Sequence, residues 1–390
     1  AGNLPLSIGD RIGSNYGGFP GYLDEVRISS GALEFSPLTI SLTVDRRVWR
    51  RYEPSSEIKV TVRNQQQKPL SGAKLRLLGP GWIDREIDLP TLPAEEEYTE
   101  QVSFDTTLRP DDYVLQGQVR VEGDYPMSRE ESLLLKLVPR RVPGRMPVLM
   151  WGIGSPDEFE KELPRLQELG FNHCLGFSPS PSKVWEAGKP VPTEGPVTIN
   201  SVKDMLDSAL ANDFDIAASL YAGHFLKDRK DLSRVDRNGQ PYQRHDCNAA
   251  LPGLQEFSEN YGRSVGEMYG DHPAFVAALI NSEVRDSTHV SFSRYDQEQY
   301  RKFAGEEIPA EVTDKIGPRW NTIPDFPKDR VLPDDDRLLK FYRWFWTVGD
   351  GWNPLHTAFH RGLKADGRDR IWTFYDPAIR APSIGGSGGE

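Results

Sequence analysis

One short apolar run limits what this chain can fold into. Residues 274–280 read AFVAALI, and the polar residues Asn281, Ser282 and Glu283 follow directly. The run is too short for a buried helix, and its length fits a strand that is covered on both faces. Strands of this kind occur in parallel sheets that are packed against helices. We therefore expect an α/β fold around this strand.

Apolar runs of the same kind alternate with helical patterns from Met146 onward. The other predicted strands lie at 146–151, 171–177, 215–221 and 370–375, and the predicted helices lie at 155–169, 201–212, 254–268, 338–348 and 355–363. The first helix has Ser155 as its N-cap, followed by Pro156. A long loop is expected at 285–332. This alternation predicts a parallel sheet.

Five parallel strands fit a (β/α)8 barrel better than an open dinucleotide-binding sheet. The first strand is followed by WGIGS at 151–155, which lacks the third glycine of a dinucleotide fingerprint. A complete barrel takes roughly 250 residues, and the long loops use up the length of 146–390 by the fifth strand. We expect a TIM-type barrel over 146–390 that is incomplete and contains the first five strands.

Residues 37–140 have a different pattern, in which apolar and polar residues alternate in short runs. Ile40, Leu42 and Val44 share one face of the first run, and turn-forming segments at 69–72 and 109–112 separate later runs. About seven strands over roughly 100 residues predict an immunoglobulin- or fibronectin-like β-sandwich. The segment 141–145 is expected to be a linker.

The first 36 residues resemble the end of a known domain. The segment IGDRIGSNYGGFPGYLDEVRISSGAL is similar to the last strands of a laminin-G-like, concanavalin-A-type jelly roll, through Gly21, Asp24, Glu25, Val26, Arg27, Ile28, Ala32 and Leu33. The resemblance implies that 1–36 is the C-terminal end of such a domain and that the remainder lies upstream. The chain is thus expected to be multidomain, with all-β parts before the α/β barrel.

Charge and composition exclude several classes of function. The net charge of -11 and the pI near 5.3 argue against nucleic-acid binding, because phosphates require a basic surface. No apolar run approaches the roughly 20 residues of a membrane span. The two cysteines, Cys174 and Cys247, exclude a disulfide scaffold, and whether they pair stays open. We expect no cofactor and no bound metal.

Polar and aromatic residues follow the predicted barrel strands. They are Trp151, His224, Asn281, Glu283, Tyr375 and Asp376. The chemistry of a barrel lies at the carboxyl ends of its strands, so these side chains are expected to meet on one face. Aromatic rings stack on sugars, polar groups bind hydroxyls, and a carboxyl group protonates a leaving oxygen. We expect a carbohydrate site, in which His224 is either a substrate contact or a structural hydrogen-bonding group.

The segment GDHPAFVAALINSEVRD carries a second resemblance. It is similar to the fourth helix–strand junction of the retaining (β/α)8 glycoside hydrolases of clan A. The resemblance implies that Glu283 is the acid/base and that Asn281 binds the sugar 2-hydroxyl. Ser282 separates the two, whereas the family has an adjacent Asn-Glu pair. The family's nucleophile, a Glu at the end of the seventh strand, is expected beyond Glu390, and Asp376 is expected to be a substrate contact or a structural cap rather than the nucleophile.

The resemblances predict a retaining glycoside hydrolase that acts on a polysaccharide or oligosaccharide. A secreted, cell-surface or periplasmic location fits such a substrate. The chain is expected to be inactive alone, because a retaining mechanism needs two carboxyl groups about 5 Å apart. The alternative is a non-catalytic carbohydrate-binding or cell-surface protein whose barrel has lost its nucleophile. The sugar, its linkage, endo or exo attack and the oligomeric state stay open.

Overall fold

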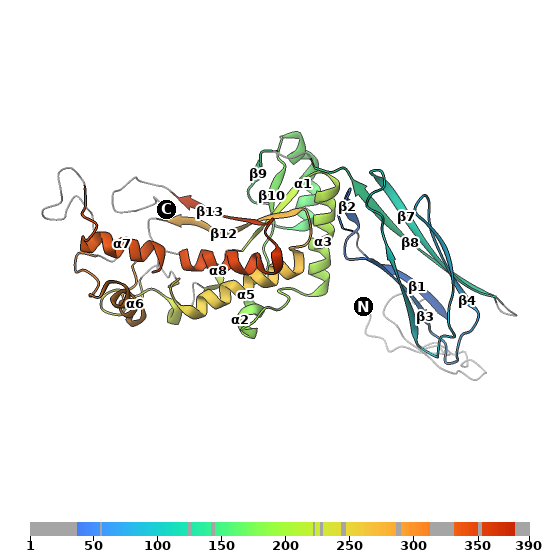
Figure 1. Cartoon of the computed structure of the whole chain (residues 1–390), viewed down its shortest axis with the longest axis horizontal. Coiled ribbons are helices and arrows are strands. Elements are labelled where there is room, and N and C mark those ends of the chain that lie inside the picture. Colours follow the sequence, from blue (N-terminus) through green and yellow to red (C-terminus); the bar gives the residue numbers. More distant parts are fainter. Residues whose placement is uncertain are drawn as a thin grey trace, which may run out of the picture.

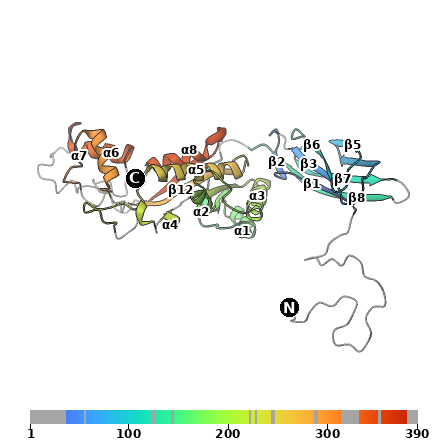
Figure 2. The ribbon, with the colours of Figure 1, turned by 90° about the horizontal axis from the view of Figure 1, so that it is seen from below.

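The computed structural model contains a β-sandwich and an α/β part that lie next to each other along the long axis of the molecule (Figure 1, Figure 2). The residues that it describes are 37–54, 57–122, 126–141, 145–220, 223–226, 229–242, 247–285, 290–312, 331–349 and 353–378. The predicted jelly-roll remnant at 1–36 lies outside the described residues.

The sandwich consists of two sheets. One sheet has the order β1-β3-β6 and the other has the order β2-β8-β7-β4-β5. Alternate residues of β3 are buried, as the alternating sequence predicts, and the ring of Trp49 lies 5.1 Å from that of Phe104 in the core between the sheets. The predicted β-sandwich is confirmed. Its strands are β1 (Leu38–Thr43), β2 (Val48–Arg50), β3 (Glu57–Asn64), β4 (Ala73–Gly79), β5 (Ile83–Asp88), β6 (Glu97–Ser103), β7 (Asp111–Val121) and β8 (Met127–Val138).

The α/β part is built on a parallel sheet. Its strands lie side by side in chain order, and every neighbouring pair is parallel. The strands are β9 (Leu149–Met150), β10 (His173–Phe177), β11 (Asp215–Ser219), β12 (Phe275–Arg285) and β13 (Trp372–Ala378). The α-helices are α1 (Pro156–Glu168), α2 (Ser182–Ala187), α3 (Pro196–Ala211), α4 (Gly223–Leu226), α5 (Pro252–Tyr269), α6 (Arg294–Ala304), α7 (Arg337–Thr347) and α8 (Asn353–Leu363).

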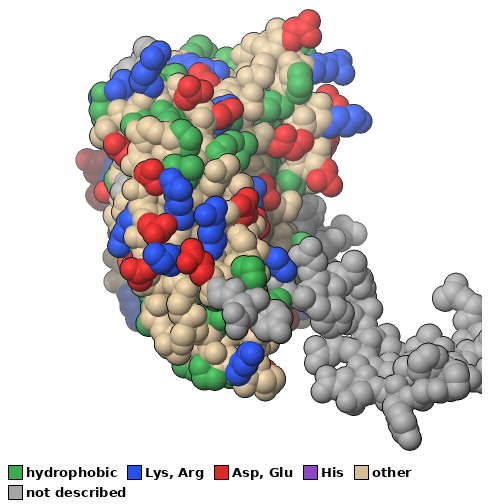
Figure 3. Space-filling view, turned by 90° about the vertical axis from the view of Figure 1, so that its right-hand side faces the viewer, with side chains coloured by type: hydrophobic (Ala, Val, Ile, Leu, Met, Phe, Trp, Pro, Cys, Tyr) green, Lys and Arg blue, Asp and Glu red, His purple; other side chains and the backbone are tan. Residues whose placement is uncertain are grey.

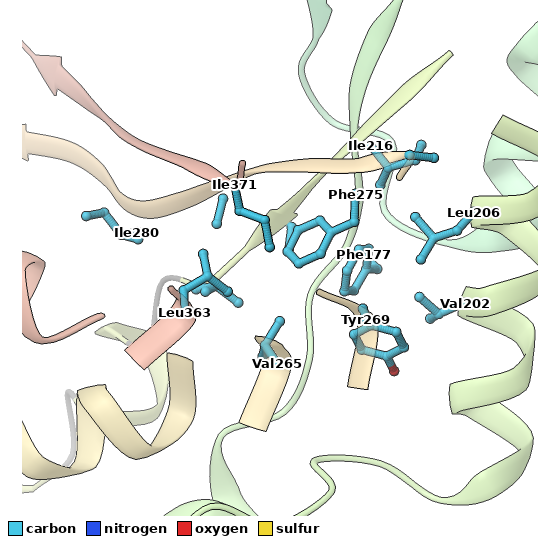
Figure 4. Packing of buried hydrophobic residues seen from close by; sticks show 14 of the residues in the cluster. Phe177, Val202, Leu206, Ile216, Val265, Tyr269, Phe275, Ile280, Leu363 and Ile371 are labelled. Atoms are coloured by element: carbon cyan, nitrogen blue, oxygen red, sulfur yellow. The ribbon is translucent and has the colours of Figure 1, made fainter. Parts of the chain in front are cut away.

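Apolar side chains of the sheet and the helices form one core (Figure 4). The rings of Phe275 in β12 and Phe177 in β10 lie 5.6 Å apart, and the ring of Tyr269 in α5 lies 5.0 Å from that of Phe177. Leu206 of α3 and Leu363 of α8 reach the same core from two further helices. Burial of this apolar surface contributes most of the free energy that stabilises the packing of the helices on the sheet.

The sheet curls into a half-barrel. Trp151 directly follows the first strand and Phe374 lies in the fifth, yet their ring centroids are 6.4 Å apart. In a flat sheet the first and fifth strands would be separated by about 19 Å, since neighbouring strands lie about 4.8 Å apart. A second apolar cluster, made of Leu175, Ala217, Ala277 and Leu279, is separate from the helix-covered core. The described strands therefore form an incomplete TIM-type barrel, as the sequence predicts.

Four helices differ from the sequence-based expectations: α2, α4 and α6 are not predicted, and α3 begins earlier than expected. Helix α6 lies within 285–332, where the sequence predicts a long loop, and its N-cap Ser293 accepts a hydrogen bond from the N–H of Asp296. Helix α3 begins at Pro196 rather than at Ser201. Pro is well suited to the first turn of a helix, because its missing N–H has no helical partner there.

The last two strands are longer than the apolar runs that predict them. Strand β12 does not stop at Asn281 but continues to Arg285, and β13 continues to Ala378. The two strands pair with each other over this extension, up to the contact of Arg285 with Ala378. Backbone hydrogen bonds between the strands thus extend the sheet beyond the part that is buried on both faces.

A carboxylate of helix α3 joins the sandwich to the half-barrel. Asp207 accepts hydrogen bonds from the backbone N–H groups of Arg47 and Val48, at 2.6 and 3.2 Å. Its Oδ1 also lies 3.1 Å from Nε2 of His272. Nδ1 of His272 accepts from the N–H of Ala274, and burial lowers the pKa of this imidazole, so the neutral ring carries its proton on Nε2 and donates to Asp207.

Both cysteines are buried, and neither forms a disulfide bond within the described residues. Burial raises the pKa of the Cys174 thiol to about 12, so this residue carries no thiolate at neutral pH. The bridge between Cys174 and Cys247 that the sequence leaves open is therefore not formed.

Acidic and basic side chains are interspersed on the face of the sandwich that Figure 3 shows. On the β4–β5 sheet, Nζ of Lys74 lies 3.6 Å from a carboxylate oxygen of Glu86, and Arg76 pairs with Asp84 at 3.3 Å. Exposed pairs of this kind contribute little to stability. None of the helices in the described ranges is both long enough and apolar enough to cross a membrane.

Candidate functional site

The carboxyl ends of the parallel strands bring the predicted residues to one end of the half-barrel. Trp151 follows β9, Asn281 lies in the second half of β12, and Tyr375 is its partner in β13. Gly152 has a φ of +100°, a left-handed conformation that favours glycine and allows a tight turn after Trp151. In a barrel this end of the strands carries the active site.

Asn281 is held by a histidine of helix α8. Asn281 is 3% exposed, and its Nδ2 lies 3.1 Å from Nε2 of His356. An amide nitrogen only donates hydrogen bonds, so Nε2 of His356 accepts and the imidazole is neutral. Burial lowers the pKa of His356 to about 4, which agrees with a neutral ring at pH 7. The amide of Asn281 therefore has a fixed orientation.

The same imidazole supports Tyr375. The rings of His356 and Tyr375 are stacked, with centroids 5.2 Å apart and an angle of 21° between their planes. One turn further along α8, Nδ1 of His360 lies 2.8 Å from Oγ1 of Thr373 in β13. Two histidines four residues apart thus dock one face of α8 on the last strands of the sheet. The position of α8 determines how Asn281 and Tyr375 are presented.

A group of aromatic rings lies on the other face of the last strand, because Phe374 packs against the second apolar cluster whereas Tyr375 faces α8. Trp151 is 47% exposed and Trp372 is 39% exposed, and their rings lie 6.4 and 5.0 Å from that of Phe374. Tyr375, which is 42% exposed, follows Phe374 directly in β13. The flat faces of such rings suit sugar rings.

The backbone of Glu283 lies in β12, two residues beyond Asn281. The pairing of β12 with β13 is irregular between Asn281 and Val284, so simple alternation of faces does not hold across Glu283. The backbone of Asp376 lies in the facing part of β13. The side chains of both carboxylates, and that of His224 in α4, lie outside the described residues.

The Asp-His-Pro turn that precedes β12 lies at the opposite end of the strand. His272 donates to Asp207, and its carbonyl oxygen accepts a hydrogen bond from Nη2 of Arg370 at 2.5 Å. This turn, which is part of the second sequence resemblance, therefore supports the fold and does not line the candidate site.

The structure adds His356, Trp372 and Phe374 to the residues that the sequence singles out. The Trp-x-Phe spacing in β13 could have indicated that both rings share one face of the sheet. His356 has no comparable signal, because only the tertiary structure shows which strand its helix face meets. No group of His, Cys, Asp or Glu that could hold a metal ion occurs in the part of the chain that the structure describes.

Comparisons with known proteins give remote structural likenesses. No protein-family model matches the sequence, and no curated protein matches it. A β-galactosidase from the psychrophilic Marinomonas ef1 is similar over 59% of this chain and 37% of its own, at 15% sequence identity and a TM-score of 0.38. An exo-chitosanase from Amycolatopsis orientalis is similar over 90% of this chain and 33% of its own, at 13% identity and a TM-score of 0.30.

The sandwich has a likeness of its own among solved structures. A CARDB domain from Pyrococcus furiosus is similar over 27% of this chain and 98% of its own, at 19% identity and a TM-score of 0.23. The β-galactosidase and the exo-chitosanase are much longer, and the match spans only 37% and 33% of their lengths. The chain thus has a remote structural similarity to multidomain glycoside hydrolases.

Proposed function

We propose that this chain is part of a retaining glycoside hydrolase in which Glu283 is the general acid and base. The observation that carries the proposal is the position of Glu283, two residues beyond Asn281 on the fourth strand of a half-barrel. Catalytic groups of (β/α)8 barrels come from the carboxyl ends of several strands. The resemblance of the segment around Glu283 to the clan A hydrolases agrees with this role.

The reaction uses Glu283 twice. In the first step its carboxylic acid donates a proton to the glycosidic oxygen, while a second carboxylate attacks the anomeric carbon and the bond to the leaving group breaks. In the second step the carboxylate of Glu283 takes a proton from water, which displaces the enzyme ester with retained configuration. The resemblance assigns the attacking carboxylate to a Glu on a seventh strand, which is not among the described residues.

Asn281 is suited to bind a sugar hydroxyl at the point of cleavage. Its Nδ2 is engaged by neutral His356, and turning the amide over would bring two acceptors together. The amide oxygen therefore keeps one direction and can accept a hydroxyl proton without being reoriented. Such preorganised hydrogen bonds contribute more in the transition state than in the ground state.

The exposed aromatics supply the binding surface for the sugar rings. Trp151, which follows the first strand, and Trp372 of the fifth strand expose their rings near Phe374, and Tyr375 exposes its ring on the other face of the fifth strand. Stacking on Trp151 and Trp372 positions a pyranose ring. Polysaccharide is an extracellular substrate, and a secreted, cell-surface or periplasmic location is part of the proposal.

The decisive experiment replaces Glu283 by Gln in the full-length protein. We expect Glu283→Gln to lower the hydrolysis of glycosides with poor leaving groups by about 10²- to 10⁴-fold, because general acid catalysis contributes about this much. Formation of the glycosyl-enzyme from a dinitrophenyl glycoside, whose leaving group needs no proton, should be far less affected, and azide should restore turnover. Glu160→Gln, on the exposed side of α1, is the matched control. Unchanged hydrolysis in Glu283→Gln contradicts the proposal.

The second candidate function is carbohydrate binding without turnover. The exposed rings of Trp151 and Trp372 favour it, because they can bind sugar without a catalytic pair. The same preparations distinguish the two functions. Saturable quenching of tryptophan fluorescence by an oligosaccharide, with no hydrolysis by the full-length protein, would establish binding alone.

A further inference from the structure

A cavity lies between the sandwich and the half-barrel, at the amino-terminal ends of the barrel strands. Its volume is about 660 Å³, and residues of both parts line it. Arg46, Arg50 and Glu53 come from the sandwich, whereas His272 and Arg370 directly precede the last two strands of the half-barrel. The cavity is therefore distinct from the candidate carbohydrate site, which lies at the other end of the strands.

Three arginines from two segments, Arg46 and Arg50 in the sandwich and Arg370 in the half-barrel, line this cavity. Protein atoms around Arg370 lower the pKa of its guanidinium, and the nearby charges of Arg50 and Arg46 lower it further. Burial also lowers the pKa of Arg50. A guanidinium is a strong base that stays charged in proteins. The mutual repulsion of the three groups would be relieved by a negative charge in the cavity.

The carboxylates of the wall are already engaged. Glu53 accepts hydrogen bonds from Nη2 of Arg46 at 2.7 Å and from the N–H of Arg50 at 3.1 Å. The other acidic residues of the wall each have a basic partner: Asp45 pairs with Lys203, Glu267 with Arg263, and Asp271 with Arg368. Arg50 also lies 3.8 Å from Asp215, so Arg370 is the arginine of the wall that forms no ion pair with a described residue.

Two guanidinium groups in particular have capacity for a ligand. Nη1 of Arg46 is buried and has no hydrogen-bond partner among the described residues. Nη2 of Arg370 donates to the carbonyl oxygens of Gly270 and His272, and Nη1 donates to that of Phe275 at 2.8 Å, so Nη1 keeps one further donor proton and all three acceptors are neutral. A buried donor without a partner costs about 1–3 kcal/mol, so a ligand or water that accepts from it is stabilising.

We propose that this interdomain cavity binds a small organic anion whose carboxylate, sulfate or phosphate group lies between Arg46 and Arg370. Oxyanions match the planar donor fork of a guanidinium and form charge-assisted hydrogen bonds with it. Pro54, Met268 and Val276 add apolar surface to the wall, and the volume accommodates a small body attached to the anionic group. This site does not depend on the proposed hydrolase function.

The test is a calorimetric titration of the chain with sodium sulfate, sodium phosphate and sodium glucuronate, at an ionic strength kept constant with sodium chloride. We expect saturable binding of at least one of the three. Preference for sulfate or phosphate indicates a tetrahedral ester group, and preference for glucuronate indicates a carboxylate. Heats that do not saturate for any of them overturn the proposal, because the cavity then holds water only.

Two variants and a control separate a binding site from a structural cluster. Arg46→Gln should weaken binding about tenfold or more, since it removes a charge-assisted hydrogen bond. Glu53→Gln should tighten binding, because it removes the negative charge that competes for Arg46. Arg76→Gln, an exposed arginine paired with Asp84 on the sandwich, should have no effect. If Arg46→Gln does not fold, Glu53→Gln decides, and unchanged or weaker binding in it overturns the proposal.

Discussion

His356 connects the polar and the aromatic residues of the candidate site. Its Nε2 accepts from Asn281, and its ring stacks on Tyr375. The contact with Asn281 requires a neutral imidazole, and burial keeps the ring neutral by lowering its pKa to about 4. Protonation would convert the acceptor of Asn281 into a donor that faces another donor. The orientation of Asn281 is therefore expected to be lost in acid.

His356 should make the half-barrel sensitive to acid. Its pKa falls from 6.5 in the unfolded chain to about 4 in the fold, so the unfolded state binds more protons between these values. The contribution of neutral His356 to the free energy of unfolding is therefore fully present above pH 6.5. About 3 kcal/mol of it is lost as the pH falls towards 4. His356→Gln keeps an acceptor for Asn281 but does not titrate. Urea unfolding at several pH values should show that wild type loses more stability than this variant.

His360 provides the control for this experiment. It lies one turn from His356 on the same helix, and burial lowers its pKa in the same direction. It is nearer to solvent, so His360→Gln should change the pH profile less. Parallel stability profiles for wild type and His356→Gln would contradict the role that we assign to the neutral ring.

At the residue scale the sequence predicts the ends of strands better than the partners of side chains. Asn281 and Tyr375 follow from the hydrophobic runs, since parallel strands carry their polar groups to one end. The link through His356 does not follow, because it joins residues 75 positions apart and depends on how α8 is rotated. The irregular pairing around Glu283 is also a property of two strands together and has no signature in either alone.

Helices α5 and α8 pack through glycines, and this close contact determines the position of α8 (Figure 1). A Cβ atom at Gly262 of α5 would lie 2.6 Å from the carbonyl oxygen of Phe359 and 2.9 Å from the N–H nitrogen of Leu363, both in α8. Backbone atoms cannot move aside as a flexible side chain can. The small residue is therefore a requirement of the helix contact rather than of the backbone conformation of α5.

Gly262→Ala should push α8 away from α5. We expect a loss of about 1–3 kcal/mol, the usual cost of overpacking a well-packed interface. Gly253→Ala in the first turn of α5 is the control: a Cβ there meets nothing within 4 Å, and alanine should be neutral or stabilise the helix by up to about 1 kcal/mol. Urea unfolding measures both. Equal stabilities of the two variants would show that the α5–α8 contact yields without cost.

The sequence predicts most of the helices and strands, and it fails where an element buries few apolar side chains. Helix α6 has only Asp296 and Tyr300 as buried residues, so its apolar stripe is too weak to detect. Its caps were the available signal: Ser293 at the N-terminus and Gly305 in a left-handed conformation at the C-terminus. The length of strand β12 is underestimated from the sequence. Its last residues are held by pairing with β13, so they need not be apolar.

On the scale of the whole molecule, the sandwich lies at the amino-terminal ends of the barrel strands. Its contacts with the half-barrel include those of Arg47 and Val48 with Asp207 and the approach of Arg50 to the buried Asp215 at 3.8 Å, and Arg141, between the two parts, lies 2.5 Å from Asp215. Burial alone would raise the pKa of Asp215, but its contacts with His173 and Arg141 outweigh this and lower it, so the charge is retained. The sandwich thus leaves the carboxyl-terminal face of the strands uncovered.

Asp207→Asn should loosen the attachment of the sandwich without altering the candidate site. The amide can accept with only one of its atoms, whereas the carboxylate accepts from Arg47, Val48 and His272 through both oxygens. Loss of one buried hydrogen bond to a charged group costs about 1.5–3 kcal/mol. Trypsin cleavage at Arg140, Arg141 or Arg145, which join the two parts, should therefore accelerate about tenfold or more, since it reports the opening equilibrium.

Asp204→Asn distinguishes this effect from a general weakening of α3. Asp204 lies on the exposed side of the same helix, so its replacement should leave the cleavage rate unchanged. Oligosaccharide binding should be the same in both variants, because the sandwich contacts the half-barrel at the end opposite to Asn281 and Tyr375. Accelerated cleavage together with lost binding in Asp207→Asn would instead show that the sandwich supports the fold of the whole half-barrel. Its role would then be that of a structural partner rather than an attached module.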